Sequence, residues 1–233
     1  MDEKNKQKPH YETLTLEKID QALNKKIEVI EKEFRDGFDF IKKHEKSVTF
    51  FGSARNSDDD PDYINARKLA SRISKETGYA IVTGGSGGIM EAANRGSFDV
   101  GGESLGLNIK LPQEQNANPY ITAGMEFEYF FSRKVCLSFS AEAYVYFPGG
   151  FGTLDELFEI LTLVQTGKIE PVPVLLVGSY FWNDLDKFIK EHLLKNKKID
   201  QSDLDLYKIT DNHDEIIELI KKAPIRSVIG SKK

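Results

Sequence analysis

The sequence predicts a single doubly wound α/β domain, with helices on both faces of a parallel sheet and a helical extension at the amino terminus. Two observations carry this prediction. Short, continuously apolar segments alternate with longer amphipathic segments over most of the chain, which is typical of buried parallel strands joined by helices. Three apolar segments also end in glycine-rich turns, and sheets of this kind bind ligands at the carboxyl ends of their strands.

The amino-terminal extension, residues 1–45, comes first. Residues 1–10 are charged and polar, and we expect them to be disordered. From Leu14 to Lys43 apolar residues recur at helical spacing, which predicts one or two amphipathic helices, with a break, if there is one, at Gly37. We expect them to pack on the domain that follows, residues 46–233, or on another subunit. The recurring residues are Leu16, Ile19, Leu23, Ile27, Ile30, Phe34, Phe38 and Ile41.

Residues 46–233 contain the alternation of strands and helices. Strands are predicted at Val48–Phe51, Ala80–Thr83, Ser104–Ile109, Ala143–Phe147 and Val172–Val177. Helices are predicted at Tyr63–Thr77, Ile89–Phe98, Tyr129–Ser140, Leu154–Thr166, Phe181–Lys195 and Asp214–Lys222. A length of 233 residues allows one large domain or two small ones, and the lack of repeats or a low-complexity linker favours one.

The composition argues against several classes of function. A net charge of -5 disfavours a nucleic-acid partner, because a phosphate-backbone binder carries a broadly basic surface. The single cysteine, Cys136, cannot form an intrachain disulfide and fits a reducing compartment. No apolar run reaches the roughly 18 residues of a membrane span, and the amino terminus has no signal-peptide character. The histidines lack metal-ligand spacing. We therefore expect a soluble cytoplasmic protein that neither contacts a membrane nor holds a metal.

Glycine-rich turns follow three of the predicted strands, at residues 51–53, 83–88 and 147–153. Glycine brings backbone amides close to a ligand, and a helix that starts after such a turn offers unsatisfied amides and a partial positive charge. The turn Pro148–Thr153 combines its glycines with a helix predicted to start near Thr153, so it is expected to bind a phosphate. The alternative is a tight strand-to-helix connection without a ligand. Two long glycine turns on one edge favour the ligand.

The residues and spacing within these turns limit the classes of nucleotide that the site is expected to bind. Residues 84–90 lack the lysine and serine or threonine that end a nucleoside-triphosphate loop. They also miss the dinucleotide fingerprint, whose final glycine would fall at Met90 when counted from Gly85. The next strand ends at Ile109–Lys110 without the acidic residue of an NAD site. A monophosphate needs only one phosphate-binding turn, so it fits this sequence better than a triphosphate or a dinucleotide does.

Glu156 has two interpretations. It lies three residues after Thr153, a spacing that matches a helix capping box in which Glu156 only satisfies an amide. Alternatively, it is a carboxylate one helical turn from a bound phosphoester, near the sugar. Both interpretations fit the local sequence.

The pair Arg133–Lys134 lies in an otherwise apolar segment. Adjacent helical residues point about 100° apart, so at least one of the two cations is expected to face the interior. A buried cation requires an anionic partner. That partner would be either an acidic side chain such as Glu91 or a substrate phosphate.

Taken together, these residues resemble the LOG ("Lonely Guy") family, long labelled as possible lysine decarboxylases. Its signature Pro-Gly-Gly-x-Gly-Thr-x-x-Glu is complete at Pro148–Glu156. Further blocks similar to the family lie at Phe51–Arg55, Ile89–Gly96 with its preceding glycines, and Phe130–Lys134. The resemblance runs from about Ser47 to Lys222. It implies a Rossmann-like fold, homodimers or higher homo-oligomers and no organic cofactor.

The resemblance also implies a reaction. A nucleoside 5′-monophosphate, such as AMP or the N6-modified cytokinin riboside 5′-monophosphate, would be cut into free base and ribose 5-phosphate. The family's catalytic pair falls on Arg133 and Glu156. Breaking a glycosidic bond builds oxocarbenium character, which an ionised carboxylate stabilises, and a glutamate with an ordinary pKa of about 4.3 is ionised at neutral pH. The expected substrate and phosphate contacts are Gly52, Ser53, Gly87, Gly88, Met90, Glu91, Arg133, Lys134, Gly149, Gly150, Phe151, Gly152 and Thr153.

Two other functions compete with this hydrolase. A nucleotide sensor or carrier would use the same pocket without cleavage, and the release of adenine from AMP distinguishes the two. A pyridoxal-phosphate decarboxylase, following the old label, would require a Schiff-base lysine and is disfavoured.

Overall fold

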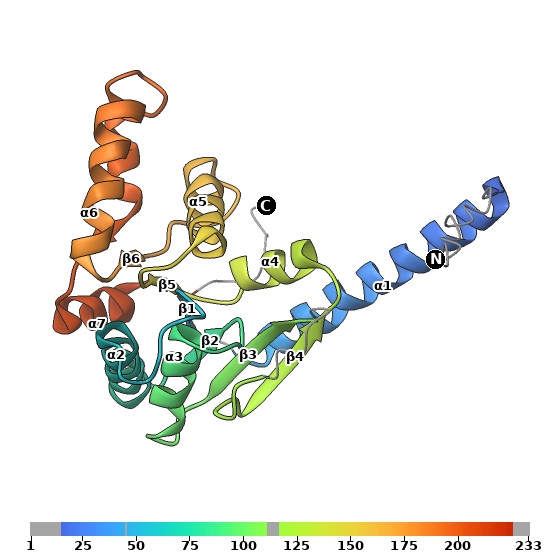
Figure 1. Ribbon diagram of the computed structural model, residues 1–233, viewed down its shortest axis with the longest axis horizontal. Helices are drawn as coiled ribbons and strands as arrows, with labels where there is room; N and C mark the ends of the chain where they lie inside the picture. Colours follow the sequence, from blue (N-terminus) through green and yellow to red (C-terminus); the bar gives the residue numbers. More distant parts are fainter. Residues whose placement is uncertain (1–14, 45, 111–116, 226–233) are drawn as a thin grey trace, which may run out of the picture.

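The computed structural model describes residues 15–44, 46–110 and 117–225, and the segment predicted to be disordered, residues 1–10, lies outside them. Within these ranges the chain forms one seven-stranded sheet in which every neighbouring pair is parallel, with the strand order β4-β3-β2-β1-β5-β6-β7 (Figure 1). The predicted α/β fold is therefore confirmed. The strands are β1 (Ser47–Phe51), β2 (Ala80–Thr83), β3 (Ser104–Ile109), β4 (Ala123–Phe127), β5 (Ala143–Tyr146), β6 (Val174–Leu176) and β7 (Lys208–Ile209).

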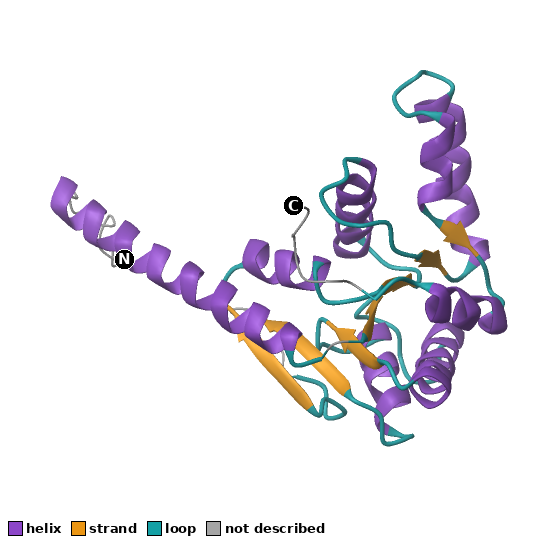
Figure 2. Cartoon of the chain, turned by 180° about the vertical axis from the view of Figure 1, so that it is seen from behind, coloured by secondary structure: helices purple, strands orange, loops and turns teal. Residues whose placement is uncertain are grey.

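Helices cover both faces of the sheet (Figures 1 and 2). One face packs against α2 (Pro61–Thr77), α3 (Ile89–Phe98) and α7 (His213–Lys222). The other packs against the carboxyl end of α1 (Leu16–Lys42) and against α4 (Phe130–Ser138), α5 (Phe151–Gln165) and α6 (Ser179–Phe188). A short π-helix, Ile189–Leu194, continues α6, and a 3-10 turn follows at Gln201–Leu206. The central strands β1, β2 and β5 are buried at every position, which explains their continuous apolar sequences.

The sequence did not reveal two edge strands. In β4 the even-numbered residues Gly124 and Glu126 are exposed and their neighbours are more buried, so the strand has no continuous apolar run. In β7 there are only two residues. Both lie at the ends of the strand order, where one side of the strand has no partner.

The extension is one continuous helix rather than two. Gly37 lies inside α1 and does not break it; a Cβ atom there would come within 2.4 Å of Cys136 Sγ. Glycine is required at this position because α1 and α4 approach closely. The amino-terminal end of α1 projects away from the sheet (Figures 1 and 2), and there Leu16, Leu23 and Ile27 are 80%, 50% and 59% exposed.

The direction of the strand order changes between β1 and β5. From β1 the chain moves through β2 and β3 to one side, and from β5 through β6 and β7 to the other. Diverging connections leave a crevice at the carboxyl ends of the two central strands, which is the usual ligand site of such sheets. Two of the glycine-rich turns follow these two strands. No helix among the described ranges is both long and apolar enough to cross a bilayer.

Candidate active site

The three glycine-rich turns meet at Ser53. Its backbone amide donates a 3.0 Å hydrogen bond to the Pro148 carbonyl, which joins the turns after β1 and β5. Its carbonyl accepts a 2.9 Å hydrogen bond from the Ile89 amide at the start of α3, which joins the turn after β2. The sheet thus brings together segments almost a hundred residues apart.

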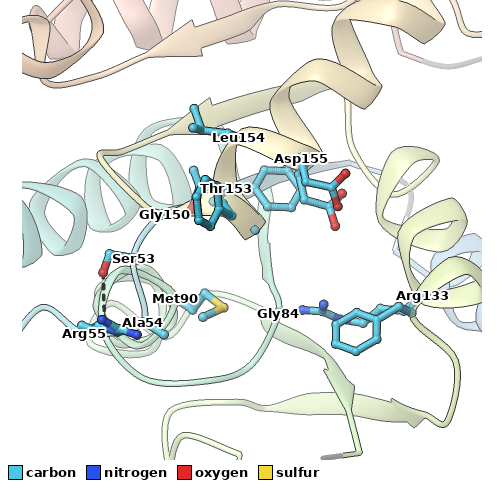
Figure 3. Close-up of a pocket in the computed structure, with 16 residues that line it drawn as sticks. Ser53, Ala54, Arg55, Gly84, Met90, Arg133, Gly150, Thr153, Leu154 and Asp155 are labelled. Atoms are coloured by element: carbon cyan, nitrogen blue, oxygen red, sulfur yellow. Dashed lines mark hydrogen bonds between the residues drawn. The ribbon is translucent and has the colours of Figure 1, made fainter. Parts of the chain in front are cut away.

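A cavity of about 780 Å³ opens above this junction, within the size range of small-molecule sites. Figure 3 shows Gly150, the residue before α5, with Thr153 and Asp155 of α5 on one side of the cavity and Gly84, Met90 and Arg133 on the other. The cavity is lined by Phe51, Gly52, Ser53, Ala54, Arg55, Gly84, Met90, Phe130, Arg133, Gly150, Phe151, Gly152, Thr153, Leu154, Asp155 and Glu156.

The amino terminus of α5 opens into the cavity. The N-cap is Gly150 and the helix begins at Phe151, three residues before the predicted start at Leu154. No side chain caps this end. The first amides of a helix have no intrahelical acceptor, and with the helix dipole they favour an anion. Thr153 is therefore inside the first turn, where its amide donates to the Gly150 carbonyl at 3.0 Å. The capping-box interpretation of Thr153 and Glu156 is wrong.

Glu156 is a buried carboxylate at the cavity wall. Its side chain is 8% exposed, and Oε2 accepts no hydrogen bond from any part of the chain that the structure describes. Burial raises the pKa of Glu156 to about 7, and the positive charges of Lys134 and Arg133 only partly oppose that rise. The expectation that Glu156 is fully ionised at neutral pH therefore needs correction: near pH 7 the carboxyl group is divided between its two protonation states.

Of the two adjacent cations on α4, Arg133 and Lys134, Arg133 is the one that lines the cavity. Its Nε donates a 2.7 Å hydrogen bond to the Leu107 carbonyl of β3. A Cβ atom on Gly84 would lie 2.1 Å from Nη2, so the guanidinium occupies the space that the missing side chain leaves. Burial lowers the pKa of Arg133, and the negative charge of Glu156 opposes this. Glu91, the acidic partner considered above, instead accepts a 3.0 Å hydrogen bond from the Tyr63 hydroxyl.

Lys134 points away from the cavity toward α5. Its Nζ lies 2.7 Å from Asp155 Oδ2 and 2.9 Å from Glu159 Oε2, so it links α4 to α5. Burial alone would lower the pKa of Lys134, but the two carboxylates raise it above its ordinary value. Of the residues expected to contact substrate, those that do not line the cavity are Gly87, Gly88, Glu91, Lys134 and Gly149.

Several cavity residues were absent from the expected set. They are Phe51, Ala54, Arg55, Gly84, Phe130, Leu154 and Asp155. Phe130 could have been predicted from the sequence, because it precedes Arg133 by three residues on a helix and the two side chains therefore share a face. The others lie in or near the glycine-rich turns or in the first turns of α5, and only the fold reveals which of them face the cavity.

Replacing Lys134 with methionine is expected to leave KM for the substrate within about twofold, because the lysine lies outside the cavity. Loss of the two ion pairs should lower the free energy of unfolding by about 1 kcal/mol. The Lys134 charge also lowers the pKa of Glu156, so this pKa should be higher in the variant than in the wild type. Steady-state kinetics and urea unfolding measure these effects, with Lys190→Met, another ion-paired lysine, as control. A large rise in KM alone would instead make Lys134 a substrate ligand.

The fold and the cavity define a Rossmann-like α/β protein in which a helix amino terminus without a side-chain cap opens into a cavity at the switch point of the sheet. A family model described as possible lysine decarboxylase matches residues 90–220. The probable cytokinin riboside 5′-monophosphate phosphoribohydrolase LOG4 of Oryza sativa subsp. japonica is 31% identical over 181 residues, covering 76% of this chain and 77% of that one. The chain belongs to the LOG family.

Solved structures share the fold at lower identity. The molybdenum cofactor carrier protein of Chlamydomonas reinhardtii has a TM-score of 0.57 and 20% identity, over 77% of this chain and 98% of that one. The molybdenum cofactor binding protein of Rippkaea orientalis has a TM-score of 0.55 and 22% identity, over 75% and 93%. At these identities the likeness concerns the fold alone.

Proposed function

We propose that the protein hydrolyses the N-glycosidic bond of a nucleoside 5′-monophosphate, releasing the free base and ribose 5-phosphate. AMP and N6-modified AMP, such as a cytokinin riboside 5′-monophosphate, are the proposed substrates. The observation that carries the proposal is one cavity in which a helix terminus suited to phosphate stands beside a buried carboxylate, Glu156, and a buried guanidinium, Arg133.

The 5′-phosphate would bind at the start of α5. Gly150, Phe151 and Gly152 line the cavity there, the end of the helix has no side-chain cap, and the dipole of the 15-residue helix adds favourable potential. The Ser53 and Thr153 hydroxyls lie in the same lining and can donate to phosphate oxygens. A phosphate held here would direct its ribose toward Glu156, one turn further along α5.

Glu156 and Arg133 would then act on the glycosidic bond. As the bond from C1′ to the base nitrogen breaks, positive charge develops on the sugar and negative charge on the base. The Glu156 carboxylate stabilises the sugar cation and accepts a proton from the attacking water, whose oxygen bonds to C1′. The Arg133 guanidinium stabilises the electron pair on the departing base. The proton that Glu156 took from water then passes to this base, which restores the carboxylate. Met90 and Phe130 supply apolar surface for the base.

The names of the relatives support this assignment. Several proteins about 30% identical to the chain are named cytokinin riboside 5′-monophosphate phosphoribohydrolases. The older label is less consistent with the site, because no lysine is among the described residues that line the cavity. A Schiff base to pyridoxal phosphate would require one.

A panel of nucleotides tests the proposal. Purified protein is incubated with AMP, N6-isopentenyl-AMP, GMP, CMP and UMP, and the free base and ribose 5-phosphate are both quantified. We expect equal amounts of the two products from at least one adenine nucleotide, and far slower cleavage of adenosine, which lacks the phosphate. If AMP binds in calorimetry but no base is released under any condition, the protein is a nucleotide carrier or sensor instead.

A further inference from the structure

Glu33 is a buried carboxylate in the middle of α1, a helix that otherwise contacts the body of the protein through apolar side chains. It is 7% exposed. Both of its oxygens accept hydrogen bonds from the segment that begins α4: Oε1 from the backbone amide of Glu128 and Oε2 from the hydroxyl of Ser132. These partners lie 95 and 99 residues further along the chain.

The start of α4 has no cap of its own. Its N-cap residue, Tyr129, makes no side-chain hydrogen bond, and its first turn contains no acidic residue. A carboxylate near a helix amino terminus satisfies free donors and is attracted by the positive end of the dipole. Glu33 therefore holds the residue that precedes the N-cap and the Ser132 side chain in the first turn of α4, and its charge lies near the positive end of the helix dipole.

The contact between α1 and α4 has a defined register. Glu33 meets Ser132, and one helical turn further on Gly37 meets Cys136. Aromatic pairs flank these contacts, Phe34 with Phe131 at 6.5 Å and Phe38 with Phe139 at 6.0 Å between ring centroids. Because Gly37 leaves no gap against Cys136, the helices can hardly slide past each other.

Arg133 follows Ser132 directly. The Ser132 side chain faces α1. The Arg133 side chain instead lines the cavity, and its Nε donates a hydrogen bond to the Leu107 carbonyl of β3. A tilt of the first turn of α4 would therefore move the guanidinium. A displacement of about 1 Å at a reacting group can reduce a rate by about 10²-fold.

We propose that Glu33 is a positioning residue, which holds the first turn of α4 so that the Arg133 guanidinium meets the substrate. The inference rests on the proposed function insofar as Arg133 acts on the substrate. It assigns the extension a role in the site although no residue of α1 lines the cavity.

The test combines substitutions at Glu33 with one at Arg133. Glu33→Ala is expected to lower kcat/KM about tenfold per folded molecule, and Glu33→Gln, which keeps an acceptor for the Glu128 amide, to lower it less. In an Arg133→Lys background both substitutions should have little further effect, because residues that act through one group are not additive. Glu31→Ala is the matched control, since Glu31 is exposed on the same helix and forms an ion pair with Arg35.

A second measurement, the NMR signal of the Arg133 side chain, does not depend on turnover. The Arg133 Nε–H resonance in ¹⁵N spectra should shift in Glu33→Ala as its bond to Leu107 weakens, and stay in place in Glu31→Ala. An unmoved resonance, or an equal loss of activity in both backgrounds, would overturn the inference and leave Glu33 a purely structural residue. If the wild-type protein cleaves no nucleotide, the proposed function fails, whereas the resonance still decides the role of Glu33.

Discussion

Replacing Glu156 with glutamine is expected to lower turnover by about 10²-fold or more, the usual contribution of a general acid or base. The amide has the same shape as the carboxyl group but cannot accept a proton or balance charge on the sugar. Base release from AMP, followed per folded molecule, measures the loss. Glu218→Gln is the control, because Glu218 is an exposed carboxylate that pairs with Lys221 and lies outside the cavity lining. Near-normal turnover in Glu156→Gln would remove Glu156 from the reaction.

The same substitution should change how stability depends on pH. Because burial raises the pKa of Glu156 from an ordinary 4.5 to about 7, the folded state loses stability as the pH rises through that interval. Glutamine does not titrate. The unfolding free energy of the variant relative to the wild type should therefore grow by about 3 kcal/mol between pH 4.5 and pH 8. A difference that stays constant over this interval would mean that the carboxyl group is not held in a desolvated environment.

Wild-type kcat/KM should follow the same ionisation. If the carboxylate is the active form, kcat/KM rises with pH through about 7, since this parameter reports groups of the free enzyme. Phosphate also titrates near pH 6, so its contribution is separated by measuring the binding of ribose 5-phosphate to Glu156→Gln over the same interval. A rate that falls through pH 7 would make Glu156 a proton donor rather than an acceptor.

Replacing Arg133 with alanine is expected to lower kcat/KM by about 10²- to 10³-fold, as when an oxyanion donor is removed from an active site. A second effect follows from charge. Arg133 lowers the pKa of Glu156, so in its absence the pH at which kcat/KM is half-maximal should move upward. Both effects are measured in one set of pH profiles.

Arg67→Ala is a suitable control for Arg133→Ala, because Arg67 forms a surface ion pair with Asp99 and lies outside the cavity lining. It should change neither the rate nor the pH profile. If Arg133→Ala lowers the rate but leaves the pH dependence unchanged, Arg133 and Glu156 do not share an electrostatic environment, and the proposed division of roles is wrong.

The sequence pattern predicted the strands correctly where helices cover both faces of the sheet. Val48–Phe51 and Ala80–Thr83 are buried throughout and mostly apolar because both faces of the sheet are covered, and α3 has the predicted bounds. Edge strands such as Ala123–Phe127 carry no such signal. The start of α5 was misplaced because its cap is Gly150, which offers no side chain to recognise, while Thr153 has the residue type that usually caps a helix.

The sequence indicated where the candidate site lies but not its ionisation behaviour. The glycine turns were visible in the sequence, and the resemblance to the LOG family singled out Arg133 and Glu156. The pKa of Glu156 depends on burial among residues that only the fold brings together. Glu33 resembled any polar residue of an amphipathic helix, because its partners lie nearly a hundred residues away.

The packing of Gly37 against Cys136 turns the only thiol of the chain into a natural reporter. Burial, reinforced by the negative charge of Glu33, raises the pKa of this thiol to about 12, so the reactive thiolate is scarce. Because Cys136 is fully buried, alkylating reagents reach it only after an opening that uncovers it, and the separation of α1 from α4 is one such opening. Labelling rates followed by mass spectrometry therefore count these openings directly, without any engineered probe.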